Sequence, residues 1–237
     1  MTNTSNVIKK VAIKGPIKAF TISLSNFLNT YLYFMSEAKI RLSQKEMDLV
    51  SNADLILTKN SILQKVNQLL GSLQAKQQQC IEMYSNKLPD EIITSSAKIS
   101  KGENYIGLPY LILDYPKKFE KENICAIRTM FWWGNFFSVT LHLSGIPKQE
   151  AEQKLIIAYP LLKESGYYCY INQDQWQHHF EKDNYISLAA ISSTEFENLV
   201  REKPFIKLAN KIPLEQWDNA EEILLTYFKL IIEVLVD

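Results

Sequence analysis

The 237-residue sequence predicts an α+β fold, with a helical N-terminal segment packed on a mainly antiparallel sheet and a long C-terminal helix. Three observations lead to this prediction. Apolar residues before Leu88 recur at helical spacing, short strand-like runs separated by turn residues follow Pro89, and the last apolar segment is again helical in spacing. We therefore expect a helical N-terminal segment over residues 1–88 and an α+β domain over residues 89–237.

The N-terminal segment is predicted to contain successive helices. Apolar positions follow helical spacing over residues 26–42. Ser43 and Glu46 then form a capping-box pattern, in which each side chain accepts a hydrogen bond from the other residue's backbone amide. A break is expected at residues 58–61, because most residues of this Thr-Lys-Asn-Ser stretch prefer caps and turns to helix interiors.

A narrow apolar seam follows this break, and it allows two interpretations. Its members, at alternating spacings of three and four, are Leu63, Val66, Leu70, Leu73, Gln77, Cys80 and Tyr84. The seam packs either on the rest of the same chain or on a second copy as a two-chain coiled coil. Because it lasts barely three heptads, packing within the chain is favoured, and a homodimer is the alternative.

The rest of the chain alternates between predicted strands and helices. Strands are expected at residues 97–101, 110–115, 124–133, 136–144, 167–171, 185–191 and 205–211. A helix over 148–162 follows Pro147, a short helix begins at Ser193, and the last helix spans 218–236. Asp218, with Glu221 three residues later, is expected to cap that last helix.

The hairpin around Gly134-Asn135 is the most informative stretch. A two-residue loop at this pair would place Trp133 opposite Phe136 and Phe131 opposite Ser138. One face of the hairpin would then be apolar apart from one arginine, and it should lie against helices. Its members would be Ile124, Ala126, Arg128, Met130, Trp132, Phe137, Val139, Leu141 and Leu143. The other face would mix rings, hydroxyls and an imidazole, and its members would be Cys125, Ile127, Thr129, Phe131, Trp133, Phe136, Ser138, Thr140, His142 and Ser144.

The mixed face has the composition of a ligand pocket wall, with apolar area and a few polar groups. An ordinary sheet face half covered by a loop is the alternative, and it is favoured. The candidate ligand-binding residues are Arg128, Phe131, Trp133, Phe136, Ser138, Thr140 and His142. An arginine on a buried face needs an acidic partner, for which Asp114 is the candidate. Arg128 is therefore either part of a structural ion pair, which is favoured, or an anion-binding residue at the pocket edge.

Composition and motifs exclude several common functions. Lys and Arg number 26 and Asp and Glu number 26, so the net charge is zero and a general nucleic-acid binder is not expected. The seven glycines form neither a dinucleotide fingerprint nor a phosphate-binding loop, and a nucleophile-elbow motif is missing. We therefore expect no cofactor.

A metal site is also not expected. In a helix, Asp174, His178 and Glu181 would share one face and could offer ligands to a divalent ion, with His142 approaching from the sheet. An exposed surface turn is the favoured interpretation of this stretch.

The sequence shows no apolar run long enough to span a membrane and no secretory signal. Three scattered cysteines, Cys80, Cys125 and Cys169, favour reduced thiols, so a cytoplasmic protein is expected.

Two stretches, GLPYLILDYP and IRTMFWWGNFFSVTLHLSG, resemble a family of uncharacterised bacterial proteins with no assigned function. The resemblance covers residues 107–145 and carries no functional residues with it. It implies that the hairpin is a structural centrepiece shared within that family.

We expect a non-catalytic binding or interaction module that uses the mixed sheet face or the helical seam, with a small-molecule ligand or a protein as partner. The alternative is an enzyme with its site on the same face, in which Arg128 holds an anionic group and His142 acts as the base.

Overall fold

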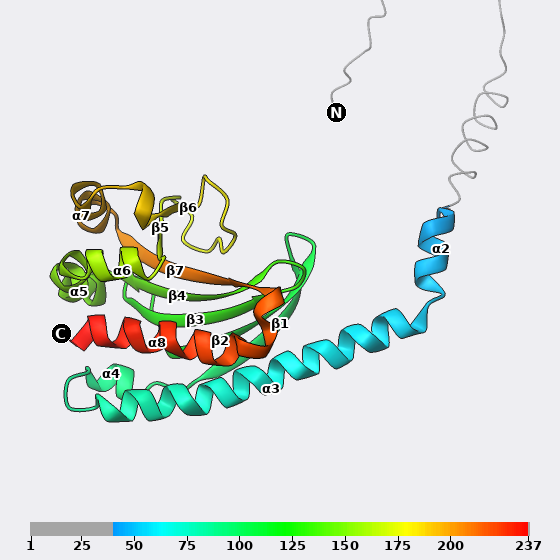
Figure 1. The fold of residues 1–237 in the computed structure, drawn as a ribbon, viewed down its shortest axis with the longest axis horizontal. Coiled ribbons are helices and arrows are strands. Elements are labelled where there is room, and N and C mark those ends of the chain that lie inside the picture. Colours follow the sequence, from blue (N-terminus) through cyan, green and yellow to red (C-terminus); the bar gives the residue numbers. More distant parts are fainter. Residues whose placement is uncertain (1–39, 237) are drawn as a thin grey trace, which may run out of the picture. The chain divides into compact units, whose positions relative to one another are not determined.

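The computed structural model describes residues 40–236, which form helices and one sheet (Figure 1). The helix predicted over 26–42 falls outside these residues except for its last three positions, which are not helical. The helices are α2 (Gln44–Val50), α3 (Ala53–Met83), α4 (Asp90–Ile93), α5 (Gly145–Ile157), α6 (Tyr159–Glu164), α7 (Ser193–Glu202) and α8 (Ala220–Val236). The strands are β1 (Lys98–Tyr105), β2 (Leu108–Phe119), β3 (Ile124–Trp132), β4 (Phe136–Ser144), β5 (Tyr168–Tyr170), β6 (Tyr185–Ser187) and β7 (Phe205–Pro213).

All seven strands belong to one antiparallel sheet with the order β1-β2-β3-β4-β7-β5-β6. The first four strands are neighbours in both sequence and space. β7 then pairs with β4, so the segment that contains β5 and β6 is placed beyond it. The predicted α+β class, with an antiparallel sheet and a long C-terminal helix, is confirmed.

The described residues divide into two units, with the boundary between Ala53 and Asp54. In the first unit the predicted capping box is confirmed at the start of α2. The Ser43 amide donates to Glu46 Oε2 at 2.7 Å, and the Glu46 amide donates to Ser43 Oγ at 3.3 Å. These two bonds satisfy backbone groups that a helix start otherwise leaves without partners.

Helix α3 runs without interruption from Ala53 to Met83, so the break predicted at residues 58–61 is wrong. Asn60 and Ser61 are exposed, and each costs an exposed helix only a few tenths of a kcal/mol relative to alanine, which a long helix tolerates. The seam residues Val66, Leu70 and Leu73 are fully buried in the same cluster as the sheet residues. The interpretation that the seam packs within its own chain is confirmed.

Three other elements begin or end at residues that differ from the predicted ones. The helix predicted over 148–162 is two helices, α5 and α6, that meet at Ala158. Pro160 stands in the first turn of α6, and its missing amide prevents α5 from continuing through it. The strand predicted over 185–191 ends at Ser187, whose side chain caps a short 3₁₀ turn. The last helix begins at Ala220, after a 3₁₀ turn over Leu214–Asn219, and not at Asp218.

The predicted register of the central hairpin is wrong by one residue. Trp132 pairs with Phe136, Arg128 with Thr140, and Ala126 with His142. The loop contains three residues, because the Asn135 amide closes the turn onto the Trp132 carbonyl at 3.1 Å. Gly134 has φ +70°, a conformation that glycine adopts without a steric penalty.

A one-residue shift exchanges the faces of one strand relative to the other. We call the side of the sheet that packs on α3, α5 and α8 the helix face, and the opposite side the polar face (Figure 1). On the hairpin, the helix face carries Cys125, Ile127, Thr129, Phe131, Phe137, Val139, Leu141 and Leu143. The polar face carries Ile124, Ala126, Arg128, Met130, Trp132, Phe136, Ser138, Thr140, His142 and Ser144.

Candidate functional site

The polar face gathers charged and hydroxyl side chains from neighbouring strands. Cross-strand pairing links Lys98 of β1, Asp114 of β2, Arg128 of β3 and Thr140 of β4 in one row across the sheet. Facing residues in adjacent strands lie on the same side of a sheet, so these four side chains share the polar face.

A β-bulge in β2 adds two more residues to this face. The register between β2 and β3 shifts between Asp114 and Lys117, so that Lys117 pairs with Ala126 and Phe119 with Ile124. Without the extra residue, Lys117 would lie on the helix face, because sides alternate along a strand. The bulge therefore places a cation and an aromatic ring beside Arg128.

The centre of this row is the ion pair between Arg128 and Asp114, which confirms the partner predicted for the arginine. Arg128 Nε donates to Asp114 Oδ1 at 2.7 Å, and NH2 donates to Oδ2 at 3.0 Å. The Asp114 side chain is 8% exposed and that of Arg128 is 17% exposed. Two parallel bonds fix the plane of the guanidinium, which is the geometry that favours recognition of planar anions.

A second cation, Lys207 of β7, lies directly beside His142 of β4. Lys207 is 1% exposed. Its Nζ donates to the carbonyl oxygens of Gln175 and Gln177, at 3.0 and 2.5 Å, and lies 4.0 Å from the centroid of the Tyr170 ring. Burial, together with the nearby charge of Arg128, lowers the pKa of Lys207 to about 7.

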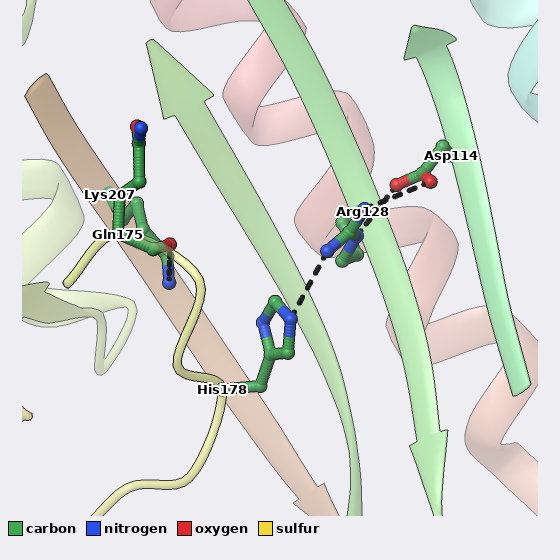
Figure 2. Close-up of polar contacts among 5 residues, drawn as sticks. All are labelled: Asp114, Arg128, Gln175, His178 and Lys207. Atoms are coloured by element: carbon green, nitrogen blue, oxygen red, sulfur yellow. Dashed lines mark hydrogen bonds and ion pairs between the residues drawn. The ribbon is translucent and has the colours of Figure 1, made fainter. Parts of the chain in front are cut away.

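These carbonyls belong to residues 171–184, which join β5 to β6 and cross the polar face; we call them the covering segment (Figure 2). His178 Nε2 lies 3.1 Å from Arg128 NH1, and Gln175 Oε1 lies 3.0 Å from His142 Nε2. The amides of His178 and His179 donate to the Tyr105 hydroxyl at 2.6 and 3.1 Å. Side chains and backbone of the segment thus bond to β1, β3, β4 and β7.

Both histidines at this contact are held neutral. Burial and the charges of Lys207 and Arg128 lower the pKa of His142 to about 3, although its bond to Gln175 acts in the opposite direction. For His178, burial followed by the same two charges and the other histidines lowers the pKa well below its ordinary value. Because an amide oxygen can only accept, the His142 Nε2 that faces Gln175 carries the proton.

Beside the covering segment, the polar face opens into a cleft of about 430 Å³. We call it the Arg128 cleft; its lining residues are Lys98, Ser100, Asp114, Lys117, Phe119, Arg128 and Trp176. Three of them are cations and one is a carboxylate, which is already bonded to Arg128. The Phe119 and Trp176 rings are partly exposed, with centroids 6.2 Å apart, and the guanidinium lies 5.4 Å from the Phe119 centroid.

The structure brings together four of the seven candidate ligand-binding residues. Arg128, Ser138, Thr140 and His142 share the polar face. Phe136 also lies on this face, in a separate aromatic cluster with Trp132 and Phe180. The other two are on the opposite side.

Phe131 is 2% exposed in the helix-face core, where its ring contacts Phe137 and Trp217. Trp133 packs against the same core from the hairpin loop. Their displacement follows directly from the one-residue change in register.

Sequence reasoning missed Lys98, Lys117, Trp176 and Lys207. The bulge that turns Lys117 to this face involves Tyr115-Pro116, and proline within a strand is a known marker of an irregularity. Nothing local indicated that Lys207 is buried, because a lysine within a strand is ordinarily exposed. Its burial results from the covering segment, which is distant in sequence.

The helical metal-binding arrangement of Asp174, His178 and Glu181, the less favoured interpretation of this stretch, does not form, because the covering segment is irregular rather than helical. Asp174 caps a local turn by accepting from the Trp176 amide at 3.1 Å. Across residues 40–236, no group of three or more His, Cys, Asp or Glu side chains is placed to hold a metal ion.

None of the described helices combines the length and apolarity that a membrane crossing requires. Comparison of the sequence with models of protein families and with curated proteins finds no match. The functional argument therefore depends on the site itself.

Proposed function

We propose that this chain is a non-catalytic binding module whose Arg128 cleft takes a small anionic ligand with a flat apolar group. The observation that carries the proposal is the convergence of Arg128, Lys98 and Lys117 on one open cleft in which Asp114 is the one lining carboxylate. A carboxylate or phosphate would face a net positive wall there. The exposed Phe119 and Trp176 rings offer apolar area to the rest of the ligand.

Arg128 has donor capacity beyond the bonds described. Its bonds to Asp114 use Nε and one N–H of NH2, and the contact to His178 uses one N–H of NH1. A guanidinium carries five N–H donors. Asp114 thus orients the guanidinium, and further donors are available to an anion that enters from the side of Lys98 and Lys117.

The environment of His142 favours binding over the alternative of an enzyme with His142 as its base. A general base works best when its pKa is near the working pH, whereas that of His142 is lowered to about 3. The side chain is also 5% exposed and bonded to Gln175. His142→Gln should therefore leave ligand affinity unchanged within about twofold, whereas a role as base requires loss of turnover.

The experiment is to titrate the protein separately with phenyl phosphate, inorganic phosphate and benzylamine. Binding is measured by isothermal titration calorimetry and by the change in tryptophan fluorescence. We expect phenyl phosphate to bind more tightly than inorganic phosphate, because it also contacts the two rings, and benzylamine not to bind. Lys117→Gln should weaken phenyl phosphate binding about tenfold, the effect of one lost charge-assisted contact.

Lys65→Gln is the matched control, because Lys65 is an exposed lysine of α3, on the other side of the sheet, and its removal changes net charge equally. Equal weakening by both variants, or equal binding of phenyl phosphate and benzylamine, would contradict the proposal.

A further inference from the structure

The covering segment touches the polar face mainly through groups that can take up protons. His142 reaches Gln175 from β4, Lys207 reaches the Gln175 and Gln177 carbonyls from β7, and the segment's own His178 reaches Arg128. Its Phe180 and Trp176 rings make contacts in two places: toward the β6 end Phe180 stacks on Tyr185 at 4.4 Å, and over β2 and β4 the half-exposed Trp176 ring lies 6.2 Å from that of Phe119 and 5.7 Å from that of His142. The contacts with Arg128 and Lys207 themselves are polar bonds (Figure 2).

We propose that the covering segment is an acid-released lid: proton uptake by His142 and His178 frees it from the sheet. In the closed form each imidazole is placed against cations. Arg128 NH1 faces His178 Nε2, and Lys207 lies beside His142. A proton on either ring would add a positive charge to a buried site that already holds two, whereas in the open form water solvates that charge.

In the closed form, the charged groups near the two imidazoles disfavour their protonation, except for two carboxylates. From β3 and β7 come Arg128 and Lys207, and from the segment itself comes His179. Asp114 on β2 is engaged by Arg128. Asp174 of the segment is exposed, and its pKa is lowered by bonds from the Trp176 amide and the Gln177 side chain, so it is ionised throughout the relevant range. Tyr105, Tyr170 and Tyr185 face the same site, and burial raises the pKa of each, so they are neutral there.

The sign of the effect follows from linkage. The pKa of both histidines is lower in the closed form than in water, so the open form binds more protons and acidification favours opening. With an ordinary histidine pKa of about 6.5 in the open form, each imidazole raises the opening constant about tenfold between pH 7.5 and pH 5.5. Together they give about 100-fold. Lys207, whose pKa is about 7 in the closed form, adds about fourfold over the same pH range.

Release of the lid would remodel the proposed binding site, because Trp176 is both part of the segment and a wall of the Arg128 cleft. The inference rests on the proposed function for this consequence only. Opening itself is a property of the chain without ligand, so it can be measured in a buffer that contains only chloride as the anion.

The experiment is hydrogen–deuterium exchange of the full chain at pH 7.5 and 5.5, with rates corrected for intrinsic exchange. The amides of His178 and His179, which donate to Tyr105, report on the lid, and those of α8 report on global unfolding. We expect protection of 171–184 to fall about 400-fold, from the two imidazoles and Lys207 together, while α8 stays protected. In the double variant His142→Gln with His178→Gln, which keeps hydrogen-bonding groups without an imidazole, the effect should shrink to about fivefold or less, from Lys207 alone.

An unchanged protection of the lid in the natural chain, an undiminished effect in the double variant, or loss of α8 protection together with the lid would each overturn the proposal. His178→Gln alone keeps the test valid if the double variant does not fold, because it should remove about tenfold of the effect. A failure of phenyl phosphate to bind leaves these outcomes unaffected, so the two proposals are tested separately.

Discussion

The two faces of the sheet are closed by different kinds of interaction. On the helix face, residues such as Phe137, Val139 and Leu143 are at most 1% exposed beneath α3, α5 and α8. On the polar face, one irregular segment makes one hydrogen bond to Arg128 and two to Lys207. Dispersion and apolar burial are insensitive to pH, whereas bonds to imidazoles and a buried amine are not. The same strands therefore carry an apolar core on one side and a site with titratable groups on the other.

Phe137 and Phe136, adjacent on β4, give the largest expected contrast between the faces. Phe137 is fully buried on the helix face, and Phe136 is partly exposed on the polar face. We expect Phe137→Ala to lower the free energy of unfolding by about 3–5 kcal/mol, because it leaves a cavity in a rigid core. Phe136→Ala should cost less than half as much. Urea unfolding followed by circular dichroism measures both, and equal losses would show that the polar face is packed as firmly as the other.

Asp114→Asn should have the next largest effect. It leaves Arg128 partly buried beside a neutral amide, and we expect a loss of about 2–4 kcal/mol in the free energy of unfolding, somewhat below the value for a fully buried pair. The double change Asp114→Leu with Arg128→Leu should cost less than Asp114→Leu alone, because no uncompensated charge remains. Chemical unfolding of the three variants compares them, and a double variant that is the least stable would argue against this account.

The sequence predicted the fold class and most strands, because these depend on local alternation and turn residues. It failed on the hairpin register, since Gly134 suits loops of two and three residues equally well and the two differ by one position in every pair. That single difference decided whether Arg128 lay with His142 or against the helices. Sequence pattern alone carried no information that would resolve it.

Only the part of the site that lies on a single strand could be predicted. Ser138, Thr140 and His142 alternate along one strand, so their common face could be inferred from β4 alone. Lys207 joins them because β7 pairs with β4, but its burial, and the position of Trp176, depend on the path of residues 171–184, which has neither helical nor strand periodicity. Long-range packing of an irregular segment leaves no local signature in the sequence.

Lys207→Met should change the pH dependence of stability on the polar face. The pKa of Lys207 is about 7 in the folded chain and near 10.5 in the unfolded chain, so its stabilising contribution is complete above 10.5 and declines as the pH falls toward 7. Between pH 7 and pH 9, the free energy of unfolding of the natural chain should therefore rise by about 2 kcal/mol relative to that of Lys207→Met. Urea unfolding at both pH values tests this, with Lys65→Met, an exposed lysine on α3, as the control that should show no such gain.

The smallest expected effects come from removing two hydroxyls of the same hairpin, one on each face of the sheet. The two changes in the free energy of unfolding should have opposite signs. Thr129 Oγ1, buried on the helix face, finds no hydrogen-bond partner within residues 40–236. Ser144 Oγ, on the polar face, accepts from the Ile124 amide at 3.0 Å and donates to the Glu122 carbonyl at 2.9 Å. Thr129→Val removes an unsatisfied polar group at nearly constant shape, so it should stabilise the fold by up to about 1 kcal/mol.

Ser144→Ala should instead cost about 1–2 kcal/mol, because it leaves the buried Ile124 amide without its acceptor. Thermal unfolding of the two variants, measured at one pH beside the natural chain, compares the signs directly. If Thr129→Val destabilised the fold as much as Ser144→Ala, the hydroxyl of Thr129 would have to be satisfied in solution, and the helix face would be less strictly apolar than its packing indicates.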